Sequence, residues 1–238
     1  MKFLLTSFLV SASLFGCSPT PSYDIVIRNG MIYDGNGSNP FKRDVAIRGD
    51  SIEAVSEIIP GSARVEIDAR GLAVAPGFIN MLSWANESLI EDGRSQSDIR
   101  QGVTLEVMGE GWSMGPLNDA MKQEMVEQMG DIKYEVKWTT LGEYMEYLVQ
   151  RGISTNIASF VGATTLRIHA VGYEDRPPTP AEMDTMRSLA RQAMEEGALG
   201  VGSSLIYAPA FYAKTDELIE LCKVASEYDG MYISHMRS

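Results

Sequence analysis

Two residues with metal-binding side chains stand at the ends of apolar, β-type segments. His235 closes the segment 231–235, and Glu110 follows the segment 103–109 and lies between Gly109 and Gly111. An imidazole nitrogen and a carboxylate oxygen are both common zinc ligands. A lone histidine is more often hydrogen-bonded within a core, and a lone glutamate is more often solvated. The residue types alone therefore leave both interpretations open.

The elements that would position these side chains follow a βα pattern after Pro76. Apolar segments of strand length alternate with amphipathic helical segments, which is typical of parallel βα units. We expect strands at 77–82, 103–109, 154–161, 199–205 and 231–235. Since parallel strands direct their last side chains toward one pocket, Glu110 after the second strand and His235 at the end of the fifth would share a site.

The sequence also predicts two helices and an insertion. Thr179, Pro180 and Glu182 are typical of a helix start, and that helix should end near Gly197. A second helix should begin near 215–217 and stop before Gly230. The stretch 111–140 is long for a βα loop and contains a helical piece at 118–129, so it reads as an insertion or lid.

The segment before Pro76 has a different pattern. Short β-type runs separated by turn residues such as Asn36-Gly37 and Gly49-Asp50 predict a small antiparallel sheet over 23–75. Five strands over 76–238 then form part of a (β/α)₈ TIM-type barrel, which typically needs about 250 residues. An open doubly wound sheet is the alternative, but no Gly-x-Gly-x-x-Gly turn follows the early strands. We expect residues 1–238 alone to be inactive and prone to aggregation, because the fifth strand would be an unpaired edge.

Eight short motifs follow one another along the chain in a specific order and spacing. They are 71–80 (GLAVAPGFIN), 102–104 (GVT), 160–162 (FVG), 165–167 (TLR), 196–200 (EGALG), 205–207 (LIY), 215–218 (TDEL) and 234–237 (SHMR). No single motif is decisive, but the ordered set resembles one enzyme family, the D-aminoacylase (N-acyl-D-amino-acid deacylase) branch of the amidohydrolase superfamily. The resemblance implies a barrel with a metal, usually Zn²⁺, at the carboxyl ends of its strands, and hydrolysis of an amide.

The sequence departs from this family at three places. Leu82-Ser83-Trp84 stands where the family has His-x-His, so one metal position is lost. Glu110, after a one-residue gap, stands opposite a ligand cysteine, and a carboxylate can serve the same Lewis-basic role. Ala163 replaces a histidine in the third-strand region.

The resemblance implies roles for several of the remaining residues. His235 matches a ligand histidine, and a partner histidine and the catalytic aspartate are expected after Ser238. Tyr207 is expected to contact substrate, with an aromatic plug as the alternative. His169 matches no ligand and is expected to be structural, and Cys222, within an apolar helix pattern, is expected to be a buried, inert thiol.

Two hypotheses of function follow. The first is a hydrolase of non-peptide carbon–nitrogen bonds that holds one Zn²⁺ through Glu110, His235 and a further histidine, and acts on N-acyl-D-amino acids or small D-peptide-like substrates. The second is a catalytically inactive lipoprotein that uses the same fold to bind a small acidic or peptidic ligand. The loss of ligands at Leu82 and Trp84 favours the second.

The first residues predict export. Residues 1–16 combine a lysine with a short apolar stretch, and Leu14-Phe15-Gly16-Cys17 resembles a lipobox in which Cys17 is acylated, with a tether over 17–22. The alternative is an ordinary cleaved signal peptide with an incidental cysteine. Ser18 favours a periplasm-facing, outer-membrane location.

The composition excludes two further features. The net charge of −12 argues against a nucleic-acid partner, because phosphate binding needs a basic surface. With only two cysteines, we expect no disulfide framework.

Overall fold

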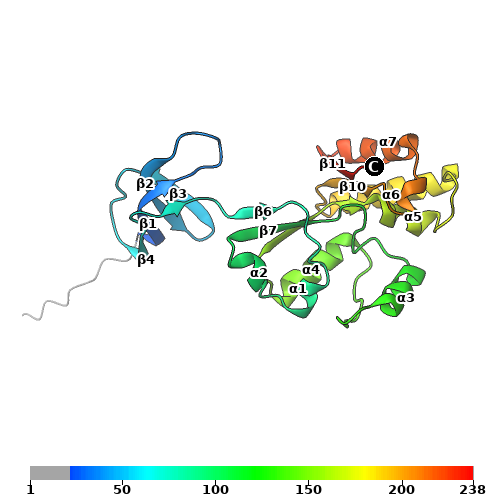
Figure 1. The fold of residues 1–238 in the computed structure, drawn as a ribbon, viewed down its shortest axis with the longest axis horizontal. Coiled ribbons are helices and arrows are strands. Elements are labelled where there is room, and N and C mark those ends of the chain that lie inside the picture. Colours follow the sequence, from blue (N-terminus) through cyan, green and yellow to red (C-terminus); the bar gives the residue numbers. More distant parts are fainter. Residues whose placement is uncertain (1–21, 238) are drawn as a thin grey trace, which may run out of the picture. The chain divides into compact units, whose positions relative to one another are not determined.

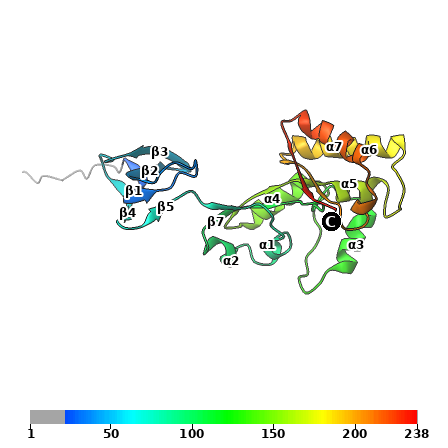
Figure 2. The same cartoon turned by 45° about the horizontal axis from the view of Figure 1, so that its top comes forward.

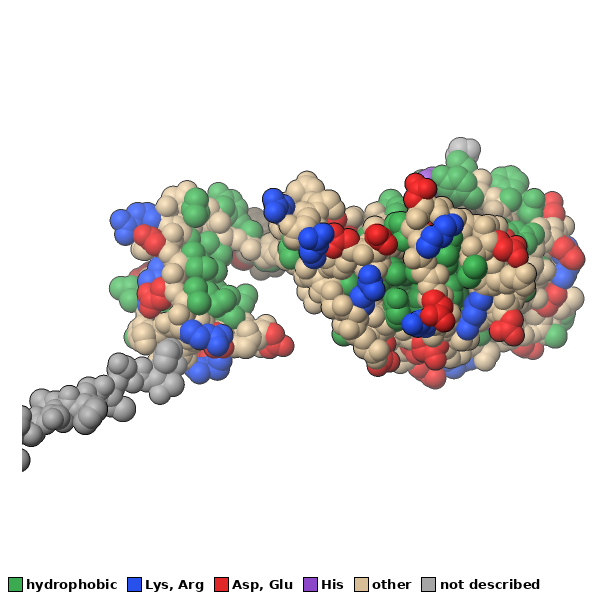
Figure 3. Space-filling model, turned by 90° about the horizontal axis from the view of Figure 1, so that it is seen from below, with side chains coloured by type: hydrophobic (Ala, Val, Ile, Leu, Met, Phe, Trp, Pro, Cys, Tyr) green, Lys and Arg blue, Asp and Glu red, His purple; other side chains and the backbone are tan. Residues whose placement is uncertain are grey.

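The computed structural model describes residues 22–237 and divides the chain into two compact units, one ending at Pro76 and one beginning at Gly77 (Figure 1). The predicted signal peptide at 1–16 and the lipidation residue Cys17 lie outside the described residues. Among residues 22–237, no helix combines the length and apolar character needed to cross a membrane. In the face shown in Figure 3, acidic and basic side chains are interspersed.

The first unit is a small mixed sheet. Its strands are β1 (Tyr23–Ile32), β2 (Phe41–Arg48), β3 (Ser51–Ser56), β4 (Ala63–Asp68) and β5 (Ala73–Val74), and Val26 and Ala46 are fully buried in its core. The prediction of an antiparallel sheet is correct for β1, β2 and β3 but wrong for β4 and β5, which both pair with β1 in parallel. The turn residues that predict hairpins carry no information about these non-local pairings.

The second unit carries five consecutive parallel strand positions. They are β6 (Phe78–Asn80), β7 (Val103–Met108), β8 (Asn156–Ser159) with its continuation β9 (Val161–Gly162), β10 (Gly200–Ser204) and β11 (Met231–His235). Each strand pairs with the next one along the chain, in the order β6-β7-β8 and β9-β10-β11. A doubly wound sheet reverses its strand order near the middle, whereas a barrel does not. The predicted α/β fold, the first five strands of a TIM-type barrel, is confirmed.

Helices follow the strands as the βα pattern requires. They are α1 (Ser88–Glu91), α2 (Gln96–Ile99), α3 (Asp119–Gln128), α4 (Leu141–Arg151), α5 (Ala163–Ala170), α6 (Pro180–Glu195) and α7 (Thr215–Ser226), with the short 3₁₀ turn η1 (Ala210–Tyr212). The structure has helices where α3, α6 and α7 were predicted. Thr179 caps α6 as predicted and forms a reciprocal capping box with Glu182. Helices α6 and α7 lie side by side (Figure 2).

A buried ion pair joins α5 to α7. The Arg167 Nη1 donates to Glu217 Oε2 at 2.7 Å, and the side chains are 0% and 5% exposed. Burial raises the pKa of the Glu217 carboxyl, and the Arg167 charge opposes that rise. Glu217 stands in a first helical turn, where a carboxylate commonly complements the helix dipole at the surface. Here Glu217 instead forms a buried ion pair that links α7 to α5.

Candidate functional site

The structure brings together the two residues that the sequence predicts as metal ligands. The Nδ1 atom of His235, at the end of β11, lies 3.6 Å from Oε2 of Glu110, which follows β7. The Glu110 side chain is 12% exposed and the His235 side chain is 43% exposed. A carboxylate and an imidazole 125 positions apart therefore meet at the carboxyl ends of two parallel strands.

Glycines explain how Glu110 reaches His235 across the sheet. Gly109 and Gly111 have φ angles of 93° and 81°, in the left-handed region that favours glycine. An ideal Cβ on Gly202 of β10 would lie 2.2 Å from the Gly109 carbonyl oxygen, and one on Gly162 would lie 2.4 Å from the Gly111 carbonyl oxygen. The backbone of 109–111 can therefore pack directly against β9 and β10, because Gly162 and Gly202 have no side chains at the points of contact.

The register of β10 and β11 places His235 on the same face. His235 pairs with Ser204, and an ideal Cβ on Gly111 would lie 2.4 Å from the Ser204 Cβ. Paired residues of neighbouring parallel strands direct their side chains to the same side of the sheet. The 109–111 segment and the His235 side chain accordingly lie on one face.

Tyr207 lies beside this pair. Its ring centroid is 5.7 Å from that of His235 in an edge-on arrangement, and 60% of Tyr207 is exposed. The position fits the predicted substrate contact, which stays a prediction.

The donor pair fits part of a zinc site. Two ligands of one tetrahedral Zn²⁺ lie about 3.3 Å apart when each bond is about 2.0–2.1 Å long, close to the 3.6 Å between Glu110 and His235. Within residues 22–237, no third histidine, cysteine, aspartate or glutamate joins them in a metal-binding group. Leu82 and Trp84 are exposed and carry no ligand atom. The described residues therefore offer two of the three or four protein ligands that such an ion requires.

One buried carboxylate on β7 was not predicted. Glu106 on β7 is 0% exposed, and its Oε2 accepts a hydrogen bond from Asn80 Nδ2 at 3.2 Å. Its Oε1 has no hydrogen-bond partner among the described residues. A single charged residue inside the apolar run of β7 was the signal that sequence reasoning overlooked.

The other titratable candidates occupy helices. His169 lies in α5, and burial lowers the pKa of its imidazole, which is the behaviour expected of a structural histidine. Cys222 lies half-buried in α7, and burial raises the pKa of its thiol. Such a thiol is a poor nucleophile and a poor metal ligand at neutral pH.

Comparisons with known proteins identify the relatives of this chain. No family model matches it. It is 32% identical over 224 residues to the D-aminoacylase of Alcaligenes xylosoxydans xylosoxydans, covering 92% of this chain and 46% of the relative. It is 31% identical over 216 residues to the N-acyl-D-aspartate deacylase of the same organism, covering 90% of this chain and 43% of the relative. The relatives of this chain thus include D-aminoacylase and other N-acyl-D-amino-acid deacylases, and a solved D-aminoacylase is described as defining a subset of amidohydrolases.

Solved structures of deacylases agree with this assignment. A D-aminoacylase described as having a binuclear metal centre superposes with a TM-score of 0.80 at 31% identity, over 91% of this chain and 46% of that one. The N-acyl-D-glutamate deacylase from Bordetella bronchiseptica, complexed with zinc and a phosphonate inhibitor, gives 0.77 at 29% identity, over 91% and 45%. The chain spans slightly less than half the length of these deacylases. The predicted resemblance is confirmed.

Proposed function

We propose that this chain supplies the first strands of the barrel of a metal-dependent deacylase that hydrolyses the amide bond of N-acyl-D-amino acids or small D-peptide-like substrates. The observation that carries the proposal is the approach of Glu110 to His235 at the carboxyl ends of β7 and β11. Homology to three deacylases of D-amino-acid derivatives supports the substrate class. The proposal follows the common placement of barrel active sites at that end of the strands.

Glu110 and His235 would hold the metal in this account. The Glu110 carboxylate contributes a negative charge from a largely buried position, and the His235 imidazole contributes a neutral nitrogen. A bound Zn²⁺ would supply Lewis-acid polarisation of the acyl carbonyl. The protein's own contribution is to keep the two donors at fixed positions, because the 109–111 backbone is pressed against the sheet.

Tyr207 would border the bound substrate. Its exposed ring stands edge-on to His235, so an N-acyl group approaching the imidazole would pass along the ring. Aromatic rings bind acyl chains and side chains through their apolar faces. Replacing Tyr207 would accordingly change substrate preference more than metal content.

The pairing of Glu110 with His235 favours the enzyme over an inactive binding protein. A barrel that served only to bind a ligand would have no need to keep a partly desolvated carboxylate next to a histidine, because burying a charge is unfavourable without a compensating partner. Glu110 is largely buried, at 12% exposure, and has His235 as its neighbour.

The location of the protein is part of the proposal. Acylation of Cys17 and a tether over 17–22 would hold the barrel at the periplasmic face of the outer membrane. The motif Leu14-Phe15-Gly16-Cys17 and the following Ser18 support this placement.

Two variants test the metal site. Glu110→Gln retains size but removes the charge, and His235→Ala removes the imidazole; in the full-length protein each should lower both zinc content and kcat/KM about 10- to 100-fold or more. Glu91→Gln, at an exposed position in α1, is the matched control and should leave both unchanged. Wild-type zinc content and turnover in Glu110→Gln, with both lost in His235→Ala, would mean that the other ligands come from later strands.

A further inference from the structure

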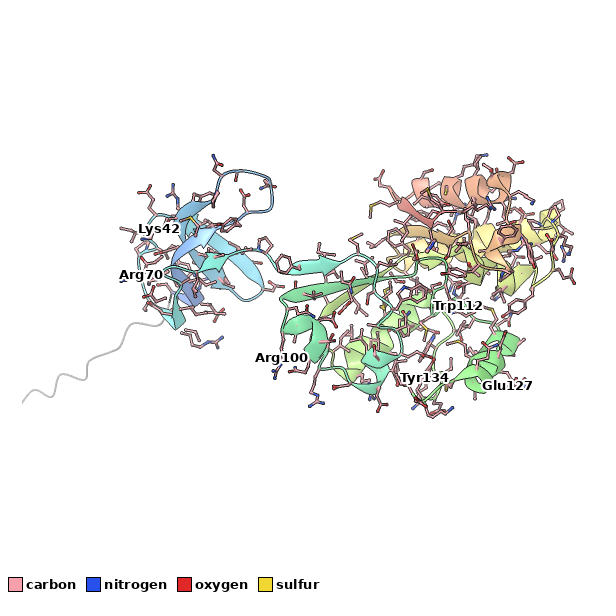
Figure 4. The ribbon with its side chains drawn as sticks, in the orientation of Figure 1. Lys42, Arg70, Arg100, Trp112, Glu127 and Tyr134 are labelled. Carbon is pink, nitrogen blue, oxygen red and sulfur yellow. The ribbon has the colours of Figure 1, made fainter. Side chains whose placement is uncertain are left out.

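A cavity of about 280 Å³ lies in the barrel unit between the segment after β6 and the insertion around α3. It is lined by Trp84, Asn86, Glu87, Trp112, Met114, Met125, Gln128 and Tyr134. We call it the aromatic cavity. Figure 4 labels Trp112 and Tyr134, which come from different parts of the insertion. Its volume is close to the lower end of the range for small-molecule pockets, about 300–1,000 Å³.

The wall that carries Tyr134 is held in place on two sides. The Tyr134 hydroxyl donates to Glu87 Oε1 at 2.8 Å, and its ring stacks on Trp138 with centroids 6.0 Å apart and planes 14° apart. Trp138 is 1% exposed, and its Nε1 donates to the Met114 carbonyl at 2.6 Å. The wall is therefore formed before any ligand arrives, which reduces the entropy lost on binding.

The lining of the aromatic cavity carries only negative charge. Glu87 is its only carboxylate, and none of the eight lining residues is a lysine, arginine or histidine. Burial, together with the hydrogen bond to Glu87, raises the pKa of the Tyr134 hydroxyl far above its usual range, so Tyr134 remains a neutral donor. A carboxylate among aromatic rings and thioethers attracts a cation with an apolar exterior.

We propose that the aromatic cavity binds an alkylammonium group. The electron-rich faces of Trp and Tyr attract organic cations, and clusters of such rings are the usual protein site for quaternary ammonium groups. Met114 and Met125 offer polarizable surface for the alkyl substituents. Glu87 supplies the opposite charge.

The cavity adjoins the carboxyl ends of the first two barrel strands. Trp84 follows Asn80 at the end of β6 by four residues, and Trp112 follows Glu110 by two. Trp84 also stands where the family resemblance places a histidine. The proposal concerns binding alone and does not depend on the reaction proposed above.

Ligand binding to the full-length protein tests the proposal directly. Choline is the cationic probe, and 3,3-dimethylbutan-1-ol is its neutral analogue of nearly the same shape. Trp84 and Trp112 line the cavity and Trp138 supports its wall, so a fluorescence change on ligand addition that is diminished in Trp84→Leu reports on this region. Calorimetry under constant ionic strength gives the affinities. Choline should bind at least about tenfold more tightly than the alcohol.

Two variants and a control make the test specific. Glu87→Gln should weaken choline binding about tenfold and leave the alcohol unaffected, and Trp84→Leu, at a residue 59% exposed, should weaken choline binding without unfolding the protein. Glu127→Gln removes a charge from an exposed position of α3 outside the lining (Figure 4) and should bind choline like the wild type. Absence of choline binding, equal affinity for the two probes, or unchanged choline binding in both Glu87→Gln and Trp84→Leu would overturn the proposal.

Discussion

Gly202 is the position at which one added carbon should disturb the candidate site most. An ideal Cβ there would lie 2.2 Å from the Gly109 carbonyl oxygen and 3.3 Å from the Glu110 Cα. A carbon and a carbonyl oxygen normally approach no closer than about 3.3 Å. In Gly202→Ala the 109–111 backbone must therefore withdraw by about 1 Å, because no flexible side chain can rotate away instead.

The consequence follows from the position of Glu110 on that backbone. A displacement of about 1 Å in a catalytic group costs on the order of 100-fold in rate, so kcat/KM of the full-length Gly202→Ala protein should fall about 100-fold. Zinc content should fall with it. Overpacking costs about 1–3 kcal/mol, so the protein should still fold, with a Tm lower by a few degrees.

The assay is the release of D-amino acid from N-acetyl-D-amino acids, with zinc measured on the same samples. Gly130→Ala is the matched control, since nothing lies within 4 Å of an ideal Cβ on Gly130 and its φ is not in the left-handed region. The control should retain wild-type activity. A folded Gly202→Ala protein with wild-type zinc content and kcat/KM would refute the argument that close backbone contact positions Glu110.

Three further predictions concern stability and location. Glu217→Gln leaves the fully buried Arg167 without a charged partner and should lower the free energy of unfolding by about 3–5 kcal/mol, measured by urea denaturation. Arg176 and the α6 cap lower the pKa of Glu182 to about 2, so the stabilisation is present above its ordinary value of 4.5 and is lost as pH falls from there toward 2; the stability difference between wild type and Glu182→Gln should shrink over that window. Cys17→Ser should release the protein from the membrane fraction or leave it unprocessed, as followed by fractionation and mass spectrometry.

Each of these predictions has a result that contradicts it. A loss below about 1 kcal/mol in Glu217→Gln would mean that the pair acts like a surface salt bridge. A difference for Glu182→Gln that is constant from pH 7 to pH 2 would contradict the depressed pKa. Wild-type protein that is soluble and carries no lipid would contradict acylation of Cys17.

The barrel strands could be predicted because each is a short, mainly apolar run bounded by glycines or other turn residues. β7 ends at Met108, just before Gly109. β11 follows Gly230, begins with an apolar run and ends in the polar pair Ser234-His235. The parallel pairing of β4 and β5 with β1 was not predictable in the same way, because their partners are non-local. Turn residues specify only the hairpins that they close.

The candidate site was predictable in part for the same reason. Glu110 and His235 could be singled out because the resemblance to the deacylases places metal ligands at these positions, and the glycines on both sides of Glu110 supported that choice. Parallel strands then bring the two side chains to one end of the sheet. The aromatic cavity could not be anticipated, because Tyr134 reaches Glu87 only when a 30-residue insertion folds back on the barrel. Likewise, the burial of Glu217 depends on Arg167, 50 positions earlier in the chain.

The central claim is that Glu110 and His235 hold one metal ion. X-ray diffraction at wavelengths on either side of the zinc absorption edge, on crystals of the full-length protein grown with zinc, tests it most directly. We predict one strong anomalous peak within about 2.0–2.2 Å of both a Glu110 carboxylate oxygen and a His235 ring nitrogen. No peak at this pair, or a zinc ion held entirely by other residues while Glu110 and His235 contact only each other, would contradict the account.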